Sequence, residues 1–267
     1  MNNFEMVLDL HQKTYFLLTG ASRGIGQMMA LKMATKLKAG SLVVLLARSA
    51  EGLAKTKADI EKLGTELQVK TYSIDLATAT QEQFVKLLTD SLDGGHQPTE
   101  FERAVIIHNA GTVGDVSKRA IDEADTKVWT DYYHMNVFSV ISLNCMFFKL
   151  FTGIPKVVVN ISSKCGIEPF ASMSFYCSGK AAREMYFKVL AVEEEQDTIV
   201  LNYSPGAIDT DMAVYVQQQT INTELAAHFL QQRITNTMLT VEQTTEQFLQ
   251  VLEEHKFKSG DHVDYWD

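Results

Sequence analysis

A tyrosine and a lysine stand four positions apart in the stretch FYCSGK, at Tyr176 and Lys180. On a helix, residues i and i+4 share a face, so the lysine ammonium can lie beneath the phenol. A charge about 4 Å away is worth roughly 4 kcal/mol at an effective dielectric of about 20, so we expect Lys180 to lower the pKa of Tyr176 from about 10. Such a pair would act as an acid–base group near neutral pH. The same spacing often marks only a solvated helix face, so the rest of the chain must decide.

A glycine-rich turn, TGASRGIG, follows the first strongly apolar run. Glycine is needed where a chain turns tightly or where its backbone approaches a ligand, and N–H groups at a helix N-terminus attract a pyrophosphate. The spacing G-x-x-x-G-x-G differs from the commoner G-x-G-x-x-G. The turn predicts a dinucleotide site; the alternative is a turn that only packs a helix on a sheet. The contacts expected here are Gly20, Ala21, Ser22, Arg23, Gly24, Ile25 and Gly26.

The end of the second apolar run indicates which dinucleotide binds. An acidic residue there usually accepts from the ribose 2′-hydroxyl of NAD, whereas an arginine suits the 2′-phosphate of NADP. This run ends in Ala47-Arg48-Ser49, and Arg23 lies within the glycine-rich turn. Two guanidinium groups on one phosphate predict NADP(H) as the cofactor, with Arg48 and Ser49 as contacts. The alternative is that Arg48 only pairs with Glu51 at the surface.

Short apolar runs alternate with amphipathic stretches along the chain. The predicted strands cover residues 14–19, 41–47, 67–74, 103–109, 156–162 and 198–204. The predicted helices lie near residues 24–38, 51–63, 80–92, 125–150 and 176–195. Strands that are apolar on both faces, each followed by a helix, favour a parallel sheet covered by helices on both sides.

Length and composition fit one α/β unit. The chain has 267 residues, of which 46% are hydrophobic, and its four prolines mark no low-complexity linker. We therefore expect a single doubly wound domain over residues 1–267. The net charge of −9 offers no basic surface, so we expect a small-molecule substrate rather than nucleic acid or an anionic membrane.

The cysteines and the apolar runs indicate in which cellular compartment the protein is expected. The three cysteines, at 145, 165 and 177, form no C-x-x-C pair, and their odd number is typical of reduced thiols in the cytoplasm. The stretch MNNFEMVLDLHQKT lacks the basic and apolar regions of a signal peptide. Apolar runs such as LVVLLA are far shorter than the roughly 20 residues that cross a bilayer. We expect a soluble cytoplasmic protein without a metal site.

Four motifs in this order resemble the short-chain dehydrogenase/reductase family: TGxxxGxG, NAG at 109–111, a serine at 163, and Tyr-x-x-x-Lys at 176–180. The resemblance covers nearly the whole chain and implies a Rossmann sheet of seven parallel strands. It implies that the NAG segment closes the fourth strand beside the cofactor, that residues 75–76 contact adenine, and that residues 208–212 form the loop beside nicotinamide. The further cofactor contacts implied are Asp75, Leu76, Asn109, Ala110, Gly111, Tyr176, Lys180, Ile208, Asp209, Thr210, Asp211 and Met212.

The resemblance also implies catalytic roles for Ser163, Tyr176, Lys180 and Asn136. It implies that Tyr176 donates a proton to a carbonyl oxygen as hydride reaches the carbon, while Lys180 lowers the tyrosine pKa and holds the nicotinamide ribose. Ser163 would donate a hydrogen bond to the substrate oxygen, where charge develops. Asn136 would support a water relay to the lysine. The structural alternatives are a strand-end cap for Ser163 and a helix-kink amide for Asn136.

Longer stretches are similar to pterin-reducing members of this family: GDVSK at 114–118, VVNISSKCGIEPF at 158–170, YCSGKAAREM at 176–185, LNYSPGAIDTDM at 201–212 and FKSGDHVDYWD at 257–267. The similarity implies NADPH-dependent reduction of pterin side-chain carbonyls, as in tetrahydrobiopterin biosynthesis. A pterin presents an amino group beside a ring N–H, and one carboxylate can accept both hydrogen bonds in parallel. Spacing does not rank Asp261, Asp264 and Asp267, but the similarity selects Asp264. It also implies a close backbone approach to the substrate at Gly206.

Three departures from the family pattern affect the expected pocket. His108 replaces the usual asparagine before NAG, and the stretch ASMSF at 171–175 differs from the relatives. Lys164 replaces an apolar residue after Ser163, and we expect it to line the substrate pocket. The full set of expected substrate contacts is Ser163, Lys164, Tyr176, Gly206 and Asp264.

Two other functions compete with a pterin reductase. A general NADPH-dependent carbonyl reductase for ketones, aldehydes or steroids would not need the pterin-directed acidic segment. A non-catalytic dinucleotide-sensing regulator should have lost Ser163, Tyr176 or Lys180, and all three are present. The helices predicted near 125–150 and 176–195 are those through which this fold dimerises, so the resemblance implies a homodimer.

Overall fold

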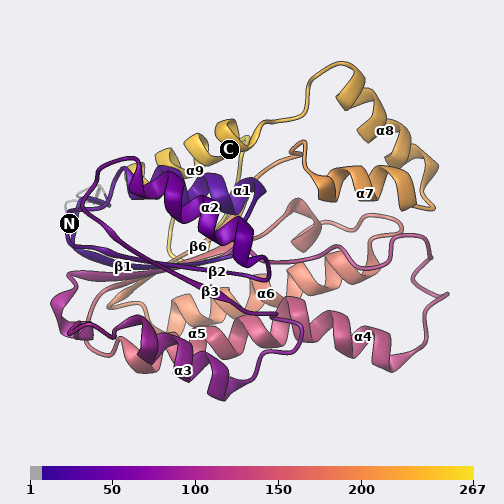
Figure 1. Ribbon diagram of the computed structural model, residues 1–267. Coiled ribbons are helices and arrows are strands. Elements are labelled where there is room, and N and C mark those ends of the chain that lie inside the picture. Colours follow the sequence, from indigo (N-terminus) through magenta and orange to yellow (C-terminus); the bar gives the residue numbers. More distant parts are fainter. Residues whose placement is uncertain (1–7) are drawn as a thin grey trace, which may run out of the picture.

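Seven parallel strands form one sheet in the computed structural model, which describes residues 8–267 (Figure 1). The strand order is β3-β2-β1-β4-β5-β6-β7, which confirms the doubly wound fold. Six strands lie within one residue of their predicted bounds, and no apolar run had located the short β7. The strands are β1 (Thr14–Thr19), β2 (Leu42–Ala47), β3 (Gln68–Ser73), β4 (Arg103–His108), β5 (Lys156–Ile161), β6 (Thr198–Ser204) and β7 (His262–Asp264).

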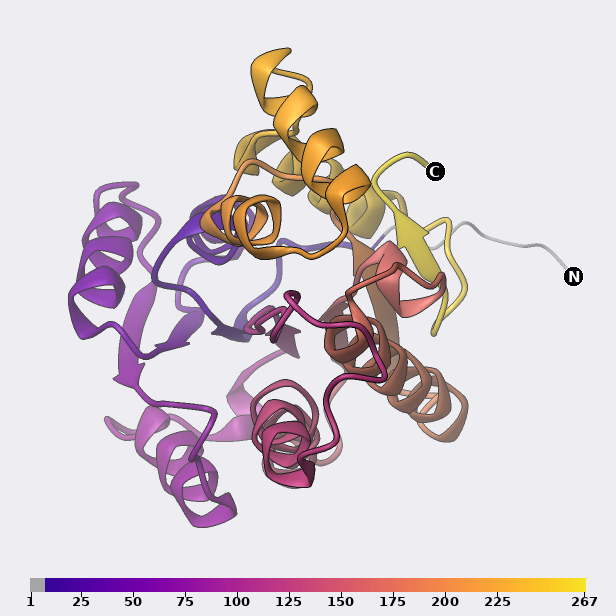
Figure 2. The same ribbon diagram turned by 90° about the vertical axis from the view of Figure 1, so that its right-hand side faces the viewer.

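Helices cover both faces of the sheet, and each face has its own apolar core (Figures 1 and 2). Met33 and Phe248 are buried on one face, and Phe84, Phe147 and Phe187 on the other. Burying apolar surface on both sides is what keeps such a parallel sheet out of water. One face carries α1 (Gly24–Ala34), α2 (Ala50–Glu61) and α9 (Val241–Glu254), and the other α3 (Gln81–Ser91), α5 (Ser139–Leu150) and α6 (Ser174–Glu193).

The helix predicted over residues 125–150 is interrupted. A π-helical turn, η2 (His134–Phe138), joins α4 (Thr126–Tyr133) to α5. Within η2, the amide of Asn136 donates to the carbonyl oxygen of Tyr132 at 2.9 Å. Wide turns of this kind are frequent at functional sites. Periodicity did not reveal the interruption because apolar residues continue through it.

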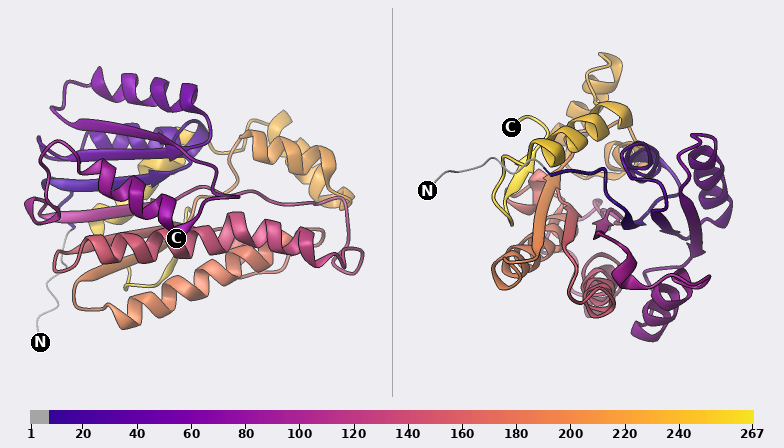
Figure 3. Two further views of the ribbon diagram at one scale, coloured as in Figure 1. Left: turned by 60° about the horizontal axis from the view of Figure 1, so that its bottom comes forward. Right: turned by 90° about the vertical axis from the view of Figure 1, so that its left-hand side faces the viewer.

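Three helices were not predicted. Besides α9, these are α7 (Asp211–Gln219) and α8 (Thr223–Ile234), which project beyond the sheet (orange in Figure 3). α8 buries none of its residues fully, although Leu225 and Phe229 stand four positions apart and pack against the apolar cluster that includes Val113. Two short 3-10 turns complete the chain, η1 (Pro98–Glu100) and η3 (Lys164–Gly166). Within residues 8–267, no helix has the length and apolar character needed to cross a membrane.

Candidate active site

The glycine-rich turn between β1 and α1 combines packing with access. A Cβ on Gly26 would lie 2.2 Å from the carbonyl oxygen of Gly20, and one on Gly20 would lie 2.7 Å from Nδ2 of Asn109. Glycine is therefore required at both positions for the turn to pack closely. Gly24 has a φ of +57° and no atom within 4 Å of its Cβ position, so its backbone faces open space where a ligand can approach. The turn thus packs closely against its neighbours at Gly20 and Gly26, and at Gly24 it leaves backbone open where a pyrophosphate could bind.

Thr19, a residue that sequence reasoning missed, ties this turn to the NAG segment. Its Oγ1 accepts hydrogen bonds from the N–H groups of Asn109 and Ala110, each at 3.0 Å. The Asn109 amide in turn donates to the carbonyl oxygens of Thr19 at 3.0 Å and Gly20 at 3.3 Å. These bonds fix the ends of β1 and β4 against each other, and so position the two segments expected to hold the cofactor.

A cavity of about 1180 Å³ opens beside these segments. It lies where the strand order reverses between β1 and β4, the usual ligand position in doubly wound sheets, and it exceeds the roughly 300–1,000 Å³ of typical ligand pockets. The residues present therefore fit a dinucleotide. The predicted cofactor residues that line it are Gly20, Ser22, Arg23, Gly24, Ile25, Gly26, Arg48, Ser49, Leu76, Asn109, Ala110, Gly111, Asp209, Thr210, Asp211 and Met212.

Five other predicted cofactor residues do not line the cavity: Tyr176 and Lys180, which are described below, and three whose side chains have other contacts. Ala21 is fully buried beneath the turn. The exposed Asp75 accepts a hydrogen bond from the N–H of Ala77 at 3.0 Å, which stabilises the bend after β3. Ile208 is buried and pairs with Leu239 in an isolated β-bridge. The side chains of these three residues thus serve the protein's own packing and turns.

Arg23 and Arg48 were expected to hold one phosphate together. Arg48 is exposed at the cavity and, within the described chain, forms no ion pair with Glu51. Arg23 instead forms an ion pair with Asp211, the first residue of α7. The two-arginine clamp is therefore not assembled here, because one guanidinium already has a carboxylate partner.

Ser163 and Tyr176 lie together beside this cavity, with Lys180 one helical turn further along. Ser163 follows β5 and caps η3, where its Oγ accepts a hydrogen bond from the N–H of Cys165 at 3.2 Å. Tyr176, in the first turn of α6, packs against a cluster that includes Val113, which also lines the cavity. Lys180 Nζ lies 5.4 Å from the centre of the Tyr176 ring. The strand-end cap was the structural alternative for Ser163, and the structure shows that the residue does cap.

The pKa of Tyr176 moves in the direction opposite to the expectation. Burial raises the pKa of Tyr176 above its usual value, and hydrogen bonding with Ser163 offsets only part of the rise. Burial, with the charge of Arg183, also holds the pKa of Lys180 well below its usual value. The Lys180 ammonium lies over the ring and donates to the carbonyl oxygen of Ile161 at 2.6 Å, so its charge does not offset burial. Burial therefore keeps the Tyr176 phenol protonated, and it also makes the phenol a weaker acid than the expected Lys180 pairing would have done.

Asn136 links the π-helical turn to the segment after NAG. Its Oδ1 accepts from the N–H of Thr112 at 2.7 Å, and its Nδ2 donates to Thr112 Oγ1 at 3.1 Å and to the carbonyl oxygen of Tyr132. Asn136 is therefore the helix-kink amide that was its structural alternative. The same bonds place it directly beneath the cavity wall, since Thr112 lines the cavity.

Arg183 is a second positioning residue that sequence reasoning missed. Its guanidinium donates to the carbonyl oxygens of His108 at 2.6 Å and Ala110 at 3.1 Å, and to Oδ1 of Asn160 at 2.8 Å. Burial lowers the pKa of Arg183 to about 10. Its position three residues after Lys180, on the same helix face, was the available signal. Arg183 holds the NAG segment from beneath, between β4 and β5.

Asp264 ends β7 at the carboxyl edge of the sheet. Ser204, its partner in the register of β6 and β7, donates its hydroxyl to Asp264 Oδ2 at 2.7 Å. The N–H of Trp266 donates to Oδ1 at 3.3 Å. β6 also pairs with β5, the strand that Ser163 follows. Because neighbouring strands lie about 4.8 Å apart, two strand spacings put Asp264 roughly 10 Å from the Ser163 position.

The carboxylates of the other two acidic residues in this segment accept backbone hydrogen bonds within turns. Asp261 Oδ2 accepts from the N–H of Lys258 at 2.9 Å, and Asp267 Oδ2 accepts from the N–H of Asp264 at 2.7 Å. Asp264 thus differs from both in lying on the sheet edge that carries Ser163. Gly206 belongs to the same edge: it has a φ of +77°, and a Cβ there would lie 2.7 Å from a Leu239 methyl group.

The three departures from the family pattern lie outside the cavity lining. Lys164 is exposed, does not line the larger cavity, and pairs through its ammonium with Glu168 at 3.5 Å. His108 is fully buried, and its Nε2 hydrogen bonds with Asn144 Oδ1 at 3.1 Å. Burial lowers the pKa of His108 to about 3, which keeps its imidazole neutral. In the stretch 171–175, two side chains are buried beneath the start of α6.

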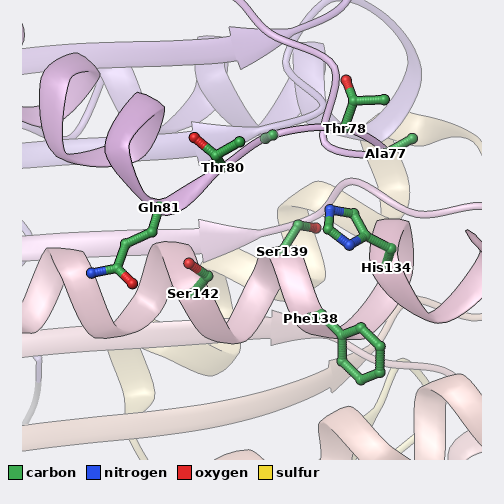
Figure 4. A pocket seen from close by; sticks show the side chains of 9 residues that line it. Ala77, Thr78, Thr80, Gln81, His134, Phe138, Ser139 and Ser142 are labelled. Carbon is green, nitrogen blue, oxygen red and sulfur yellow. The ribbon is translucent and has the colours of Figure 1, made fainter. Parts of the chain in front are cut away.

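A second cavity, of about 380 Å³, lies between the loop after β3 and the η2–α5 segment (Figure 4). The imidazole of His134 points toward Ser139 and the 77–78 loop, and its Nε2 is buried without a hydrogen-bond partner. Phe138 turns away and is 49% exposed. This cavity shares no lining residue with the larger one.

Comparison with known proteins gives the same family as the motifs. The sequence model described as short chain dehydrogenase matches residues 14–221. The sepiapterin reductase of Xenopus tropicalis is 38% identical over 94% of this chain and 95% of its own length, and that of Rattus norvegicus is 36% identical over the same shares. A solved short chain dehydrogenase of Shigella flexneri, complexed with NADP, is 26% identical with a TM-score of 0.77, covering 97% of this chain and 100% of its own.

Proposed function

The chain belongs to the short chain dehydrogenase family, a family of oxidoreductases, and on this premise we propose that it is an NADPH-dependent reductase of pterin side-chain carbonyls. Its similarity to sepiapterin reductases extends over 94% of the chain and supports this substrate class. We propose 6-pyruvoyl-tetrahydropterin and sepiapterin as its substrates, in tetrahydrobiopterin biosynthesis.

The cofactor assignment is supported by the glycine turn and by Arg48. The open backbone at Gly24 and the N-terminus of α1 suit the pyrophosphate, because free N–H groups and the helix dipole both favour an anion. Arg48, exposed at the cavity, has a free guanidinium for the 2′-phosphate, which favours NADP(H) over NAD(H). When bound, NADPH supplies the hydride that the carbonyl carbon accepts.

The protein's part in the reduction is the placement of one proton and one hydrogen bond. Tyr176 donates its phenolic proton to the carbonyl oxygen; burial keeps that proton on the phenol before the reaction, and the transfer requires charge to develop on the carbonyl oxygen as hydride reaches the carbon. Ser163 donates its hydroxyl to the same oxygen as negative charge develops there. Lys180, held by the carbonyl oxygen of Ile161, retains donors for ribose hydroxyls.

One observation carries the pterin assignment: Asp264 and Ser163 lie on the same sheet edge, separated by β6 alone. A ligand spanning roughly 10 Å can be held at both ends, with its amino-pyrimidine edge on Asp264 and its carbonyl at Ser163 and Tyr176. Each carboxylate oxygen of Asp264 has one donor from the protein and so retains a lone pair for the pterin. Gly206 lies on the same edge, where its φ of +77° and the Leu239 methyl group 2.7 Å from its Cβ position require glycine.

NADPH oxidation with sepiapterin, measured beside simple ketones and repeated with NADH, tests the proposal. We expect kcat/KM to be highest for sepiapterin with NADPH. Equal rates for ketones and sepiapterin would favour a general carbonyl reductase, for which the bonds of Ser204 and Trp266 to Asp264 would be purely structural. Binding of NADPH without turnover of any carbonyl would favour the non-catalytic sensor.

We also propose a homodimer in the cytoplasm. Met185, Val189 and Val192 lie at helical spacing on α6 and are 62%, 46% and 75% exposed, a stripe suited to packing against a second copy. Cys145, Cys165 and Cys177 are free thiols, as is usual in a reducing compartment. A Val189→Glu substitution should shift the sedimentation of the protein toward the monomer. The equally exposed Val85→Glu, on α3, is its control.

A further inference from the structure

Two of the three thiols flank the catalytic pair. Cys165 lies in η3, two residues after Ser163, and Cys177 lies in the first turn of α6, directly after Tyr176. Both side chains are partly buried and pack against the same apolar cluster, which includes Val113. The fold therefore brings together two thiols twelve residues apart in the sequence, on the side of the pocket where the substrate carbonyl would lie.

The two thiols are chemically unequal. Hydrogen bonding between them lowers the pKa of Cys177 to about 7 and raises the pKa of Cys165 above its usual value. The Cys177 sulfur also donates weakly to the carbonyl oxygen of Glu168 at 3.9 Å, so it lies against the η3 segment. Its position in the first turn of α6 adds the favourable helix dipole. One thiolate with a neighbouring thiol is the arrangement of a redox-sensitive pair.

We propose that Cys165 and Cys177 are a peroxide-sensitive dithiol, whose oxidation to a disulfide displaces Ser163 and Tyr176 and so switches the reductase off. The disulfide itself does not depend on the proposed function, whereas the effect on turnover rests on it. The mechanism in the preceding subsection uses neither thiol.

The chemistry proceeds in two balanced steps. The Cys177 thiolate attacks hydrogen peroxide, the O–O bond breaks, and a sulfenic acid forms with release of hydroxide, a two-electron oxidation of sulfur. The Cys165 thiol then attacks the sulfenic sulfur. The S–S bond forms, the S–O bond breaks, and the departing oxygen takes up the Cys165 proton to leave as water. A dithiol such as dithiothreitol reverses the change by exchange.

A disulfide here would reach the catalytic groups through the backbone. The N–H of Cys165 donates to Ser163 Oγ at 3.2 Å, so moving Cys165 toward α6 changes the position of that hydroxyl. Tyr176 is adjacent to Cys177 on the same helical turn. Misplacement of reacting groups by about 1 Å can cost roughly a hundredfold in rate.

The first experiment follows the thiols of the full chain without any assay of turnover. The sequence has three cysteines, and we expect hydrogen peroxide to lower the free-thiol count from three to one. Peptide mass spectrometry should show Cys165 joined to Cys177, with Cys145 still alkylated. Before oxidation, iodoacetamide at pH 7 should label Cys177 faster than Cys165. Loss of a single thiol, or a sulfinic acid on Cys177 without loss of Cys165, would overturn the dithiol.

The second experiment links the disulfide to activity. Wild-type reductase and Cys145→Ser should both lose roughly ten- to a hundredfold in sepiapterin turnover after peroxide, and dithiothreitol should restore it. Cys165→Ser and Cys177→Ser should lose the dithiothreitol-reversible component, whatever their starting rates. A disulfide that forms with unchanged turnover would overturn the switch but not the dithiol. If the reduced protein turns over no carbonyl substrate, the proposed function fails while the thiol result stands.

Discussion

Arg23 and Asp211, 188 residues apart in the sequence, form an ion pair between the glycine-rich turn and the start of α7. Their side chains are 72% and 78% exposed, so the pair contributes at most about 1 kcal/mol. Both residues line the larger cavity. The pair therefore joins the two sides of the proposed cofactor site, and a phosphate can compete for Arg23 at small cost.

Asp211→Asn should strengthen NADPH binding. Removing the carboxylate frees Arg23 for the 2′-phosphate, and an exposed pair of up to about 1 kcal/mol corresponds to a decrease in Kd of up to roughly fivefold. The Kd is measured by NADPH fluorescence at low salt. Asp122→Asn is the matched control, because Asp122 pairs with Arg119 at the surface and neither residue lines the cavity. Weaker NADPH binding by Asp211→Asn would mean that Asp211 itself contacts the cofactor.

Arg48→Ala should weaken the binding of NADPH and leave the binding of NADH nearly unchanged. Losing one charge-assisted hydrogen bond costs roughly 1.5–3 kcal/mol, so we expect a loss of about ten- to a hundredfold in the affinity for NADPH. The Kd values for NADPH and NADH are measured by titrating each cofactor into the same variant. Equal losses for NADPH and NADH would show that Arg48 supports the fold rather than the 2′-phosphate.

Tyr176→Phe should retain NADPH binding and lose most reductase activity. The substitution removes only the phenolic oxygen, and a general acid typically contributes about 10²–10⁴-fold. Steady-state turnover of sepiapterin is compared with that of Tyr133→Phe, which removes a hydroxyl from the neighbouring α4. If the variant keeps more than about a tenth of wild-type turnover, Tyr176 is not the proton donor.

Asp264→Asn should separate pterin recognition from carbonyl reduction. The variant keeps its size but replaces a carboxylate with an amide, and kcat/KM for sepiapterin should fall by about ten- to a thousandfold, the scale of one or two charged hydrogen bonds. A small diketone, which has no amino-pyrimidine edge, should be reduced nearly as fast as before. Asp261→Asn is the control in the same segment. If kcat/KM falls equally for both substrates, the role of Asp264 is to hold β7 in place. If kcat/KM falls for neither substrate, the Asp264 carboxylate does not bind the pterin.

Glu184 should make the fold sensitive to acid. Its carboxylate accepts from the Ser162 hydroxyl and pairs with His262 Nδ1 at 3.1 Å and with Lys188 at 3.3 Å, which joins α6 to β5 and β7. Burial by itself would raise the pKa of Glu184, but the bonds of His262 and Ser162 hold it below its usual 4.5. A lowered pKa stabilises the fold above the unfolded value, and that contribution is lost as pH falls through the folded value.

The corresponding measurement is the Tm of wild type and Glu184→Gln between pH 3 and pH 7. At pH 7 the variant should melt roughly 3–10 °C lower, since a buried charged hydrogen bond contributes about 1.5–3 kcal/mol. The difference should shrink below about pH 4.5, because the wild-type carboxylate then takes up a proton. The exposed Glu195→Gln is the control. A difference that stays constant across this range would rule out titration of Glu184 as its cause.

Local sequence determined the sheet and the glycine turn because their signals are short-range. A run such as TYFLLT is apolar on both faces and so is stable only inside a parallel sheet, and β1 has the predicted bounds. Gly20 and Gly26 mark contacts that any Cβ would block. The family motifs likewise identified Ser163 and Tyr176, since strand and helix bring these positions together wherever the fold forms. α8 was not predicted: Leu225 and Phe229 stand at helical spacing, but the helix buries no residue fully and projects beyond the sheet.

The tertiary structure decided what the charged groups of the site do. The spacing of Tyr176 and Lys180 predicted a lowered tyrosine pKa, but burial and the carbonyl oxygen of Ile161 reverse that direction. Arg23 has a carboxylate partner 188 positions away, and Asp264 is distinguished from its neighbours only by its register beside Ser204. Residue types and spacing identify which groups a chain possesses. Their pKa values and partners depend on solvent exclusion and on contacts distant in sequence, and folding alone creates both.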